Sequence, residues 1–294
     1  MIWYAEVALF FLVSYPLSLL PLSVARKLGR LLGLGYYHWN KKRRNISIEN
    51  IRRVMEKGRL GLPQAKGLST TLGPEGLAKE SDMNLGCSVL ELVKVYHGRG
   101  KSVIGGVKFE GLENYERAKA NGKGVMLFTG HCGNWELLAL SITMKAGTIG
   151  VVGRPLKNPY LYSVLVRLRN KFGNVAIEKR GALRGMLRML AKGENVGILM
   201  DQAVVPEEGF KIDFLGMPAW TTKTPVLIAK RTGAALVPLF IKRVGDGHKI
   251  ILHPEVALTG DDILDTKRLS SYIEDYIREN PAEWLWIHRR WKRA

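Results

Sequence analysis

The stretch FTGHCGNWELL, residues 128–138, places His131, Cys132 and Glu136 within six positions, directly after an apolar run that predicts a buried β-strand. In open α/β sheets the functional side chains gather beyond the carboxyl ends of the strands, so His131 lies where a site is expected. On one regular helix His131 and Glu136 would point about 140° apart. We therefore expect His131 in a loop and Glu136 in the first turn of the following helix, where the two side chains can meet.

Gly133 and Asn134 suit such a loop, because glycine frees the backbone and asparagine caps a helix well. A histidine oriented by a carboxylate is the pair that activates hydroxyl groups: the carboxylate fixes the imidazole tautomer and stabilises the imidazolium. The sequence contains no G-x-S-x-G nucleophile elbow. We therefore expect the attacking hydroxyl to belong to a substrate, which attacks an activated acyl group directly.

Two other interpretations of the stretch stay open on these residues alone. Cys132 is an alternative nucleophile, since a thiolate beside a histidine can be acylated, although adjacent side chains in a loop usually diverge. His131 and Glu136 are also compatible with a capped helix start and an incidental histidine. The two cysteines, Cys87 and Cys132, provide no disulfide framework, and no paired cysteine–histidine spacing indicates zinc. We expect a reducing compartment, no metal and no cofactor.

After residue 105 the chain alternates buried strands with amphipathic helices. Continuous apolar runs predict strands at 124–128, 148–152, 195–200 and 235–241, with further strands at 210–216 and 248–254. Apolar residues at helical spacing predict helices over 134–145, 158–172, 181–193 and 224–233. This pattern predicts an α/β fold with a largely parallel central sheet flanked by helices. We expect a catalytic region over 105–294, preceded by covering helices and loops over 46–104.

The first 25 residues contain a single charged side chain. An apolar stretch of this length is about long enough to cross a bilayer core. Pro16 and Pro21 would break or kink a single helix there. We expect residues 1–45 to form an apolar, helical, membrane-associating segment, either a single anchor or a peripheral one, with a buried core helix as the alternative. The basic residues all follow the apolar stretch, which favours a cytoplasmic location for the rest of the chain.

The formal charge of +19 is concentrated at the two ends of the chain. The first 45 residues carry seven basic side chains and one acidic one, and the last eleven carry four basic and no acidic ones, so together they hold +10. The final EWLWIHRRWKRA interleaves three tryptophans with four cations, which is typical of a membrane-interface edge. The same pattern also suits single-stranded nucleic acid.

The segment GHCGNWE resembles the H-x-G-N-W-[E/D] version of the HX4D/E motif in the lipid A biosynthesis acyltransferases of the late, lauroyl and myristoyl type. The resemblance continues in order to the end of the chain, and this ordered set is far more specific than HX4E alone. Departures are Cys132 at the variable position, Thr224 where relatives often have glycine, and a poor match over 40–95. The further matching segments are VGRP (152–155), RLRNKFG (167–173), LAKGENVGILMDQ (190–202), DFLGMPAWTTKTPVLIAKRTGAALVP (213–238) and EWLWIHRRWK (283–292).

The resemblance implies a glycerolipid-acyltransferase-like fold and an enzyme, an O-acyltransferase. The fatty acyl chain would pass from an acyl-carrier-protein thioester, or acyl-CoA, to a hydroxyl of a lipid A precursor on the cytoplasmic face of the inner membrane. A basic surface would suit the acidic carrier protein, the phosphorylated acceptor and anionic membrane lipids. No nucleic-acid partner is expected.

Carried over by position, the resemblance makes His131 the general base and Glu136 its partner. Arg169 would stabilise the oxyanion or hold a phosphate, although cations are expected in the last turn of a helix in any case. Substrate-binding positions would be Arg169, Arg154, Asp201, Gly133 and Asn134. Alternatives are an acyltransferase of the same fold acting on another glycolipid, aminolipid or lysophospholipid, and a non-catalytic basic protein that binds membrane or nucleic acid.

Overall fold

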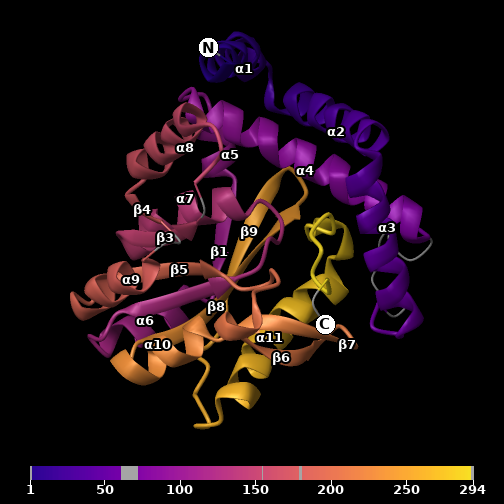
Figure 1. The fold of residues 1–294 in the computed structure, drawn as a ribbon. Helices are drawn as coiled ribbons and strands as arrows, with labels where there is room; N and C mark the ends of the chain where they lie inside the picture. The colour runs from indigo at the N-terminus through magenta and orange to yellow at the C-terminus, as the bar shows by residue number, and fades with distance from the viewer. Residues whose placement is uncertain (1, 61–71, 154, 179–180, 293–294) are drawn as a thin grey trace.

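A seven-stranded sheet in the order β1-β9-β8-β2-β5-β3-β4 forms the centre of the computed structural model, which describes residues 2–60, 72–153, 155–178 and 181–292 (Figure 1). All neighbouring strands pair in parallel except β8 and β9, which form an antiparallel hairpin. The predicted α/β fold with a largely parallel sheet is confirmed. The strands are β1 (Val107–Glu110), β2 (Val125–Thr129), β3 (Ile149–Gly153), β4 (Asn174–Glu178), β5 (Asn195–Leu199), β8 (Ala235–Val244) and β9 (Gly247–Leu252).

The five interior strands of the sheet were predicted, and the two that were missed are its edge strands. β2 is buried along its whole length, because helices cover both faces of the sheet and every position can be apolar. β1 and β4, at the two edges, were not predicted: β1 alternates half-buried and exposed residues, and Val175 in β4 is 47% exposed. A separate hairpin of β6 (Gly209–Phe214) and β7 (Met217–Thr222) lies beside the sheet, and β7 was also missed.

The two faces of β2 enter two different cores. Met126 and Phe128 pack with residues of α9, α11 and the carboxy-terminal segment, whereas Val125 and Leu127 pack with residues of α6 and α7. This follows from the alternation of side chains along a strand. The flanking helices are α5 (Lys101–Gly105), α6 (Leu112–Ala120), α7 (Trp135–Ala146), α8 (Pro159–Lys171), α9 (Ala182–Ala191), α10 (Thr224–Thr232) and α11 (Asp262–Glu279).

The amino-terminal part is helical: α1 (Ile2–Leu19), α2 (Leu22–Trp39), α3 (Lys41–Glu56) and α4 (Pro74–Tyr96). In Figure 1, α4 lies between α2 and the sheet. Pro21 precedes α2 and separates it from α1 as expected, whereas α1 continues through Pro16 to Leu19. In the described ranges, no helix combines the length and apolar character needed to cross a membrane. Membrane association of residues 1–45 stays a prediction.

Glycines allow α2 to pack directly against α4. A Cβ on Gly33 would lie 2.2 Å from the carbonyl oxygen of Asp82, and one on Gly86 would lie 2.0 Å from that of Gly29. Both separations are too short for any real side chain, so larger residues there would push the helices apart. The α2–α4 pair is therefore a close-packed unit that covers the sheet.

Candidate active site

His131 and Asp201 are brought together by the register of β2 and β5. These strands pair in parallel with Thr129 opposite Leu199, and each of the two site residues lies two positions beyond its strand end. The His131 Nδ1 atom is 2.8 Å from Asp201 Oδ1, and the His131 main-chain N–H donates to Asp201 Oδ2 at 3.0 Å. One carboxylate thus holds both the imidazole ring and the backbone that carries it.

Trp284 provides a further donor to Asp201. Its indole Nε1–H donates to Asp201 Oδ2 at 2.8 Å, and Asp201 is only 3% exposed. Burial by itself raises the pKa of Asp201, but the charge of His131 and the hydrogen bonds from His131 and Trp284 outweigh it and hold that pKa well below its ordinary value. Asp201 is therefore an ionised carboxylate at neutral pH.

The protonation of the His131 ring follows from its partners. An ionised carboxylate can only accept, so Nδ1 carries the proton and donates it to Asp201. The other nitrogen, Nε2, is 3.1 Å from the amide nitrogen of Gln202 and accepts from it in the neutral ring. Burial lowers the pKa of His131, but the Asp201 charge and hydrogen bond, with a smaller effect from Glu136, raise it above its ordinary value. Because Nδ1 carries the proton, Nε2 is the basic atom of the site. The His131 side chain is 16% exposed.

We expected the Glu136 carboxylate to orient His131, and the structure shows that it does not bond to His131. Glu136 lies in the first turn of α7 as predicted, but its carboxylate pairs with Arg169, through Oε1 to Nη2 at 2.6 Å and Oε2 to Nε at 3.1 Å. The carboxylate that bonds to His131 is Asp201, which the sequence interpretation placed among the substrate-binding residues. Glu136 acts on His131 through its charge alone.

Arg169 is 7% exposed and lies in the last turn of α8. A surface cation at a helix end would be solvated, whereas Arg169 holds Glu136 with two parallel hydrogen bonds, which fixes the plane of its guanidinium. This places the Arg169–Glu136 ion pair at the first turn of α7, which follows the loop that carries His131. Arg154, the other predicted arginine, lies outside the described residues.

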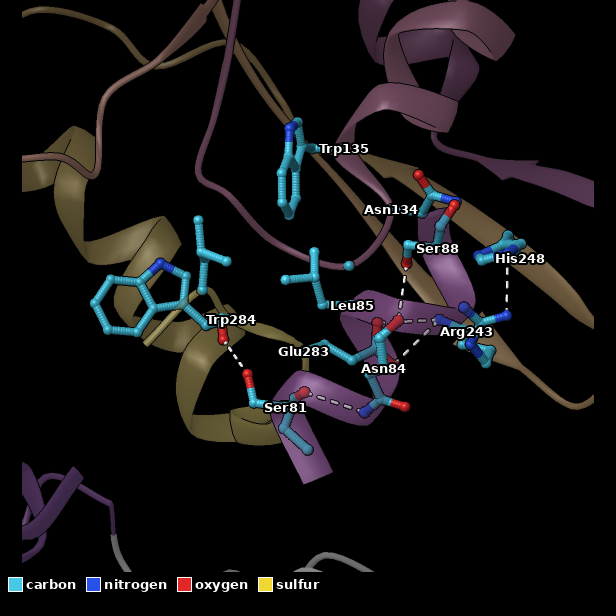
Figure 2. A pocket seen from close by; sticks show the side chains of 13 residues that line it. Ser81, Asn84, Leu85, Ser88, Asn134, Trp135, Arg243, His248, Glu283 and Trp284 are labelled. Atoms are coloured by element: carbon cyan, nitrogen blue, oxygen red, sulfur yellow. Dashed lines mark hydrogen bonds between the residues drawn. The ribbon is translucent and has the colours of Figure 1, made fainter. Parts of the chain in front are cut away.

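Gly133 and Asn134 shape the loop between β2 and α7. Gly133 has a φ of +55°, and a Cβ there would lie 2.2 Å from the carbonyl oxygen of Ile241. The Asn134 side chain accepts from the Leu137 N–H at 3.2 Å, as a helix cap, and donates to Glu91 at 3.0 Å. Both residues also line a partly open pocket between α4 and the segment around Trp284 (Figure 2). Their role in substrate binding stays a prediction.

Cys132 has the properties of a structural residue. It is 1% exposed, and its backbone forms an antiparallel bridge with that of Trp284. Burial, with the charges of Asp201 and Glu283, raises the pKa of the Cys132 thiol well above its ordinary value. A thiol that stays protonated is a poor nucleophile. The geometry therefore weighs against the alternative in which Cys132 is acylated.

Three residues around His131 were missed as site residues: Gln202, Trp284 and Trp135, whose ring centroid lies 5.1 Å from that of His131. Gln202 directly follows Asp201, so its position after a strand was a usable signal. Trp284 gave no local signal for contact with a carboxylate 83 residues away. Within the described part of the chain, no three His, Cys, Asp or Glu side chains are grouped so as to hold a metal ion.

A sequence model of the family described as "Bacterial lipid A biosynthesis acyltransferase" matches residues 1–293. The chain belongs to this family. Its HX4E segment is the loop that holds His131, and the resemblance drawn from the sequence is confirmed.

Named relatives of the family differ in how much of the chain they match. The chain is similar to the phosphatidylinositol mannoside acyltransferase of Mycobacterium tuberculosis strain H37Rv, with 28% identity over 185 residues, 62% of this chain and 58% of that protein. Similarity to the lipid A biosynthesis lauroyltransferase of Escherichia coli K12 is 31% over 189 residues, 62% of this chain and 60% of that enzyme. The lipid A biosynthesis palmitoleoyltransferase of the same strain is 27% identical over 281 residues, which are 93% of this chain and 86% of that enzyme. The chain thus spans about three fifths of the length of the first two relatives.

Proposed function

We propose that the protein is an acyltransferase that moves a fatty acyl chain from a thioester, carried by acyl carrier protein or CoA, to a hydroxyl of a lipid A precursor. The observation that carries the proposal is the arrangement of His131. Its Nδ1 is bonded to the ionised Asp201, its Nε2 faces the Gln202 amide, and its side chain is 16% exposed at the carboxyl end of the sheet. This arrangement suits a general base that acts on a substrate hydroxyl.

The proposed reaction needs no covalent intermediate on the protein. The acceptor hydroxyl takes the place of the Gln202 amide at Nε2, and Nε2 removes its proton as the oxygen bonds to the thioester carbonyl carbon. The tetrahedral oxyanion then collapses, the carbon–sulfur bond breaks, and the imidazolium returns the proton to the leaving thiolate. An ester and a free thiol result. Asp201 stabilises the imidazolium between the two proton transfers.

Arg169 supplies positive charge in this scheme. With Glu136 holding its Nε and Nη2, the guanidinium is fixed before the substrate arrives, so little reorganisation is needed during the reaction. Its Nη1 atom lies near Gly153 at the end of β3, 3.6 Å from where a Cβ would stand. We expect this charge to act on the oxyanion or on a phosphate of the acceptor.

A second acceptor class is favoured by one comparison. The first relative is named a phosphatidylinositol mannoside acyltransferase, so another glycolipid is a specific alternative to the lipid A precursor. The two acceptors can be distinguished by mass spectrometry of the lipid product. Purified protein is given a mixed pool of acylated carrier protein with either a tetra-acylated lipid A precursor or a mannosylated phosphoinositide. A new ester on the precursor supports the first acceptor, and one on the phosphoinositide alone supports the second. No ester on either contradicts both acceptors.

We propose further that α1 and α2 hold the protein on the cytoplasmic face of the inner membrane. Large apolar side chains on these two helices are exposed, the extremes being Leu12 at 73% and Trp39 at 83%. Basic residues follow on α2 and α3, which suits anionic headgroups. The exposed apolar residues of the two helices are Trp3, Tyr4, Leu9, Leu12, Val13, Tyr15, Leu19, Val24, Leu31, Leu32 and Trp39.

Two half-exposed leucines provide a matched test of this surface. Leu32 on α2 is 49% exposed and Leu264 on α11 is 45% exposed, and Figure 1 shows the two helices in different parts of the molecule. Leu32→Glu should weaken co-sedimentation with vesicles that contain anionic phospholipids by roughly tenfold or more, since a buried leucine contributes about 1.5–3 kcal/mol. Leu264→Glu should leave it unchanged. Equal effects of the two changes would contradict the proposed surface.

A further inference from the structure

We propose that Trp284 is a positioning residue of the site: its indole N–H fixes the Asp201 carboxylate, and through it the ring of His131. The inference rests on the proposed acyl transfer. It concerns the carboxy-terminal segment, which crosses the loop after β2. The Leu285 N–H donates to the His131 carbonyl at 3.2 Å, and the Gly133 N–H donates to the Glu283 carbonyl at 2.7 Å. Trp284 is therefore part of the same backbone framework as His131.

The two oxygens of Asp201 have separate tasks. Oδ1 accepts from the His131 ring, and Oδ2 accepts from the His131 main chain and from Trp284. In a site where Trp284 is 1% and Asp201 3% exposed, a lost donor is not readily replaced by water. Without the indole N–H, Oδ2 keeps one donor, the His131 main-chain N–H, and the carboxylate is held less firmly in its plane. The imidazole, held by Oδ1, would follow.

The indole itself is held from several sides. The Ser81 hydroxyl of α4 donates to the Trp284 carbonyl at 2.7 Å, and Figure 2 shows Ser81 directed at the main chain of Trp284. The Trp284 ring packs against Phe214, Trp286 and Trp291, with centroid distances of 5.9, 4.6 and 6.3 Å. The donor is thus fixed before a substrate binds, which a positioning role requires.

A purely structural role for Trp284 is the alternative, since Trp284 is among the largest fully buried side chains. Trp286 offers a matched control. It lies two residues further on, is 0% exposed, and also donates its indole N–H, but to the Pro281 carbonyl at 2.7 Å. Replacing either tryptophan with phenylalanine removes one buried indole donor. Only the change at Trp284 removes a hydrogen bond to Asp201.

The test compares Trp284→Phe with Trp286→Phe in acyl-transfer kinetics across pH and in thermal unfolding. We expect Trp284→Phe to lower kcat by roughly 10- to 100-fold, the range for a lost hydrogen bond to a charged group. Its acid limb of kcat/KM should also move to higher pH, because a carboxylate with fewer donors favours the imidazolium more strongly. Trp286→Phe should destabilise the fold to a similar degree and leave the acid limb where it is in the wild type.

The possible outcomes separate the inference from the proposed function. A wild type without acyl transfer removes the proposed function and the inference with it. A wild type with transfer, but equal kinetic effects of the two variants, overturns the inference alone. If Trp284→Phe fails to fold, Ser81→Ala loosens the Trp284 backbone while all rings remain. A smaller shift of the acid limb in the same direction then supports the inference, and an unmoved limb overturns it.

Discussion

Two buried carboxylates in this protein each hold a histidine, but the two pairs differ in their other partners and in the exposure of the histidine. Asp201 bonds to His131, and Glu91 of α4 bonds to His248 of β9 at 3.0 Å. Glu91 Oε1 also forms ion pairs with Arg243 Nη1 at 2.5 Å and with Arg26 Nε at 2.8 Å. In this second cluster two arginines neutralise the carboxylate, and the His248 side chain is 1% exposed.

The comparison shows that two histidine–carboxylate pairs can differ in the surroundings of the second ring nitrogen. The second nitrogen of His131 faces Gln202, and the side chain is 16% exposed. The second nitrogen of His248, Nδ1, is buried and makes no hydrogen bond. Hydrogen bonds and charges from His248 and Arg243 outweigh burial and hold the pKa of Glu91 well below its ordinary value. The Glu91 cluster is therefore a structural joint between α2, α4 and the β8–β9 hairpin.

The largest expected difference between the two pairs is in catalysis. His131→Ala should lower the acyl-transfer rate by roughly 10⁴-fold or more, as removal of the base does in hydrolases that activate a hydroxyl. His248→Gln, which removes an imidazole whose side chain is only 1% exposed, should keep kcat within about threefold. Turnover of the lipid product measures both, and vesicle binding should be retained in each. A transfer rate unaffected by His131→Ala would contradict the mechanism.

Neutral analogues of the carboxylates should separate catalysis from stability. Asp201→Asn should lower kcat by roughly 10³- to 10⁴-fold, because an amide stabilises neither the tautomer nor the imidazolium. Glu91→Gln should instead lower the free energy of unfolding in urea by about 3–5 kcal/mol at pH 7, because two arginines lose their partner.

The pH dependence of this stability has a definite sign. The pKa of Glu91 is depressed in the folded protein, so its contribution is present above the ordinary glutamate pKa of about 4.3 and is lost as pH falls below it. The difference between wild type and Glu91→Gln should therefore shrink as pH falls below about 5. A constant difference would assign the loss to packing.

The activity profile of the wild type tests the His131 pair directly. A base must be neutral, and the pKa of His131 is raised by Asp201. The acid limb of kcat/KM should therefore titrate above about 6.5, the ordinary histidine value, with activity lost as pH falls through it. His248→Gln should show the same limb. A limb that moves in that variant would link the two clusters.

The smallest effect is expected at Cys132. Its thiol is buried and its pKa is well above the ordinary value, so Cys132→Ala should change kcat by about twofold or less while costing some stability. Steady-state kinetics and thermal unfolding measure the two effects. A loss as large as that of His131→Ala would restore Cys132 as the nucleophile.

The sequence predicted the elements around the site better than the contacts between them. The run 124–128 indicated a buried strand, and His131 after it was correctly placed in a loop, because both inferences depend on local pattern. The partner of His131 was not predictable in this way. Asp201 meets His131 because β2 and β5 are neighbours in the sheet, and sheet order is a property of the whole fold.

Glu136 shows the limit of spacing arguments. Its position in the first turn of α7 was correct, but the direction of its side chain depends on α8, which presents Arg169 to it. The hydrogen bond from Trp284 likewise depends on how the carboxy-terminal segment crosses the loop. These contacts join residues 33 and 83 positions apart, beyond the reach of a local pattern.

The glycine contact between α2 and α4 has a consequence for which lipids can react. Gly33 and Gly86 fix α2 on α4, and Glu91 of α4 joins Arg26 of α2 to Asn134, the cap of the helix after His131. If α2 rests on a bilayer as proposed, this framework sets the height of His131 above the lipid surface. Acceptor hydroxyls would then be distinguished by the depth at which they lie as well as by their chemistry, so two hydroxyls of one headgroup would differ in reactivity.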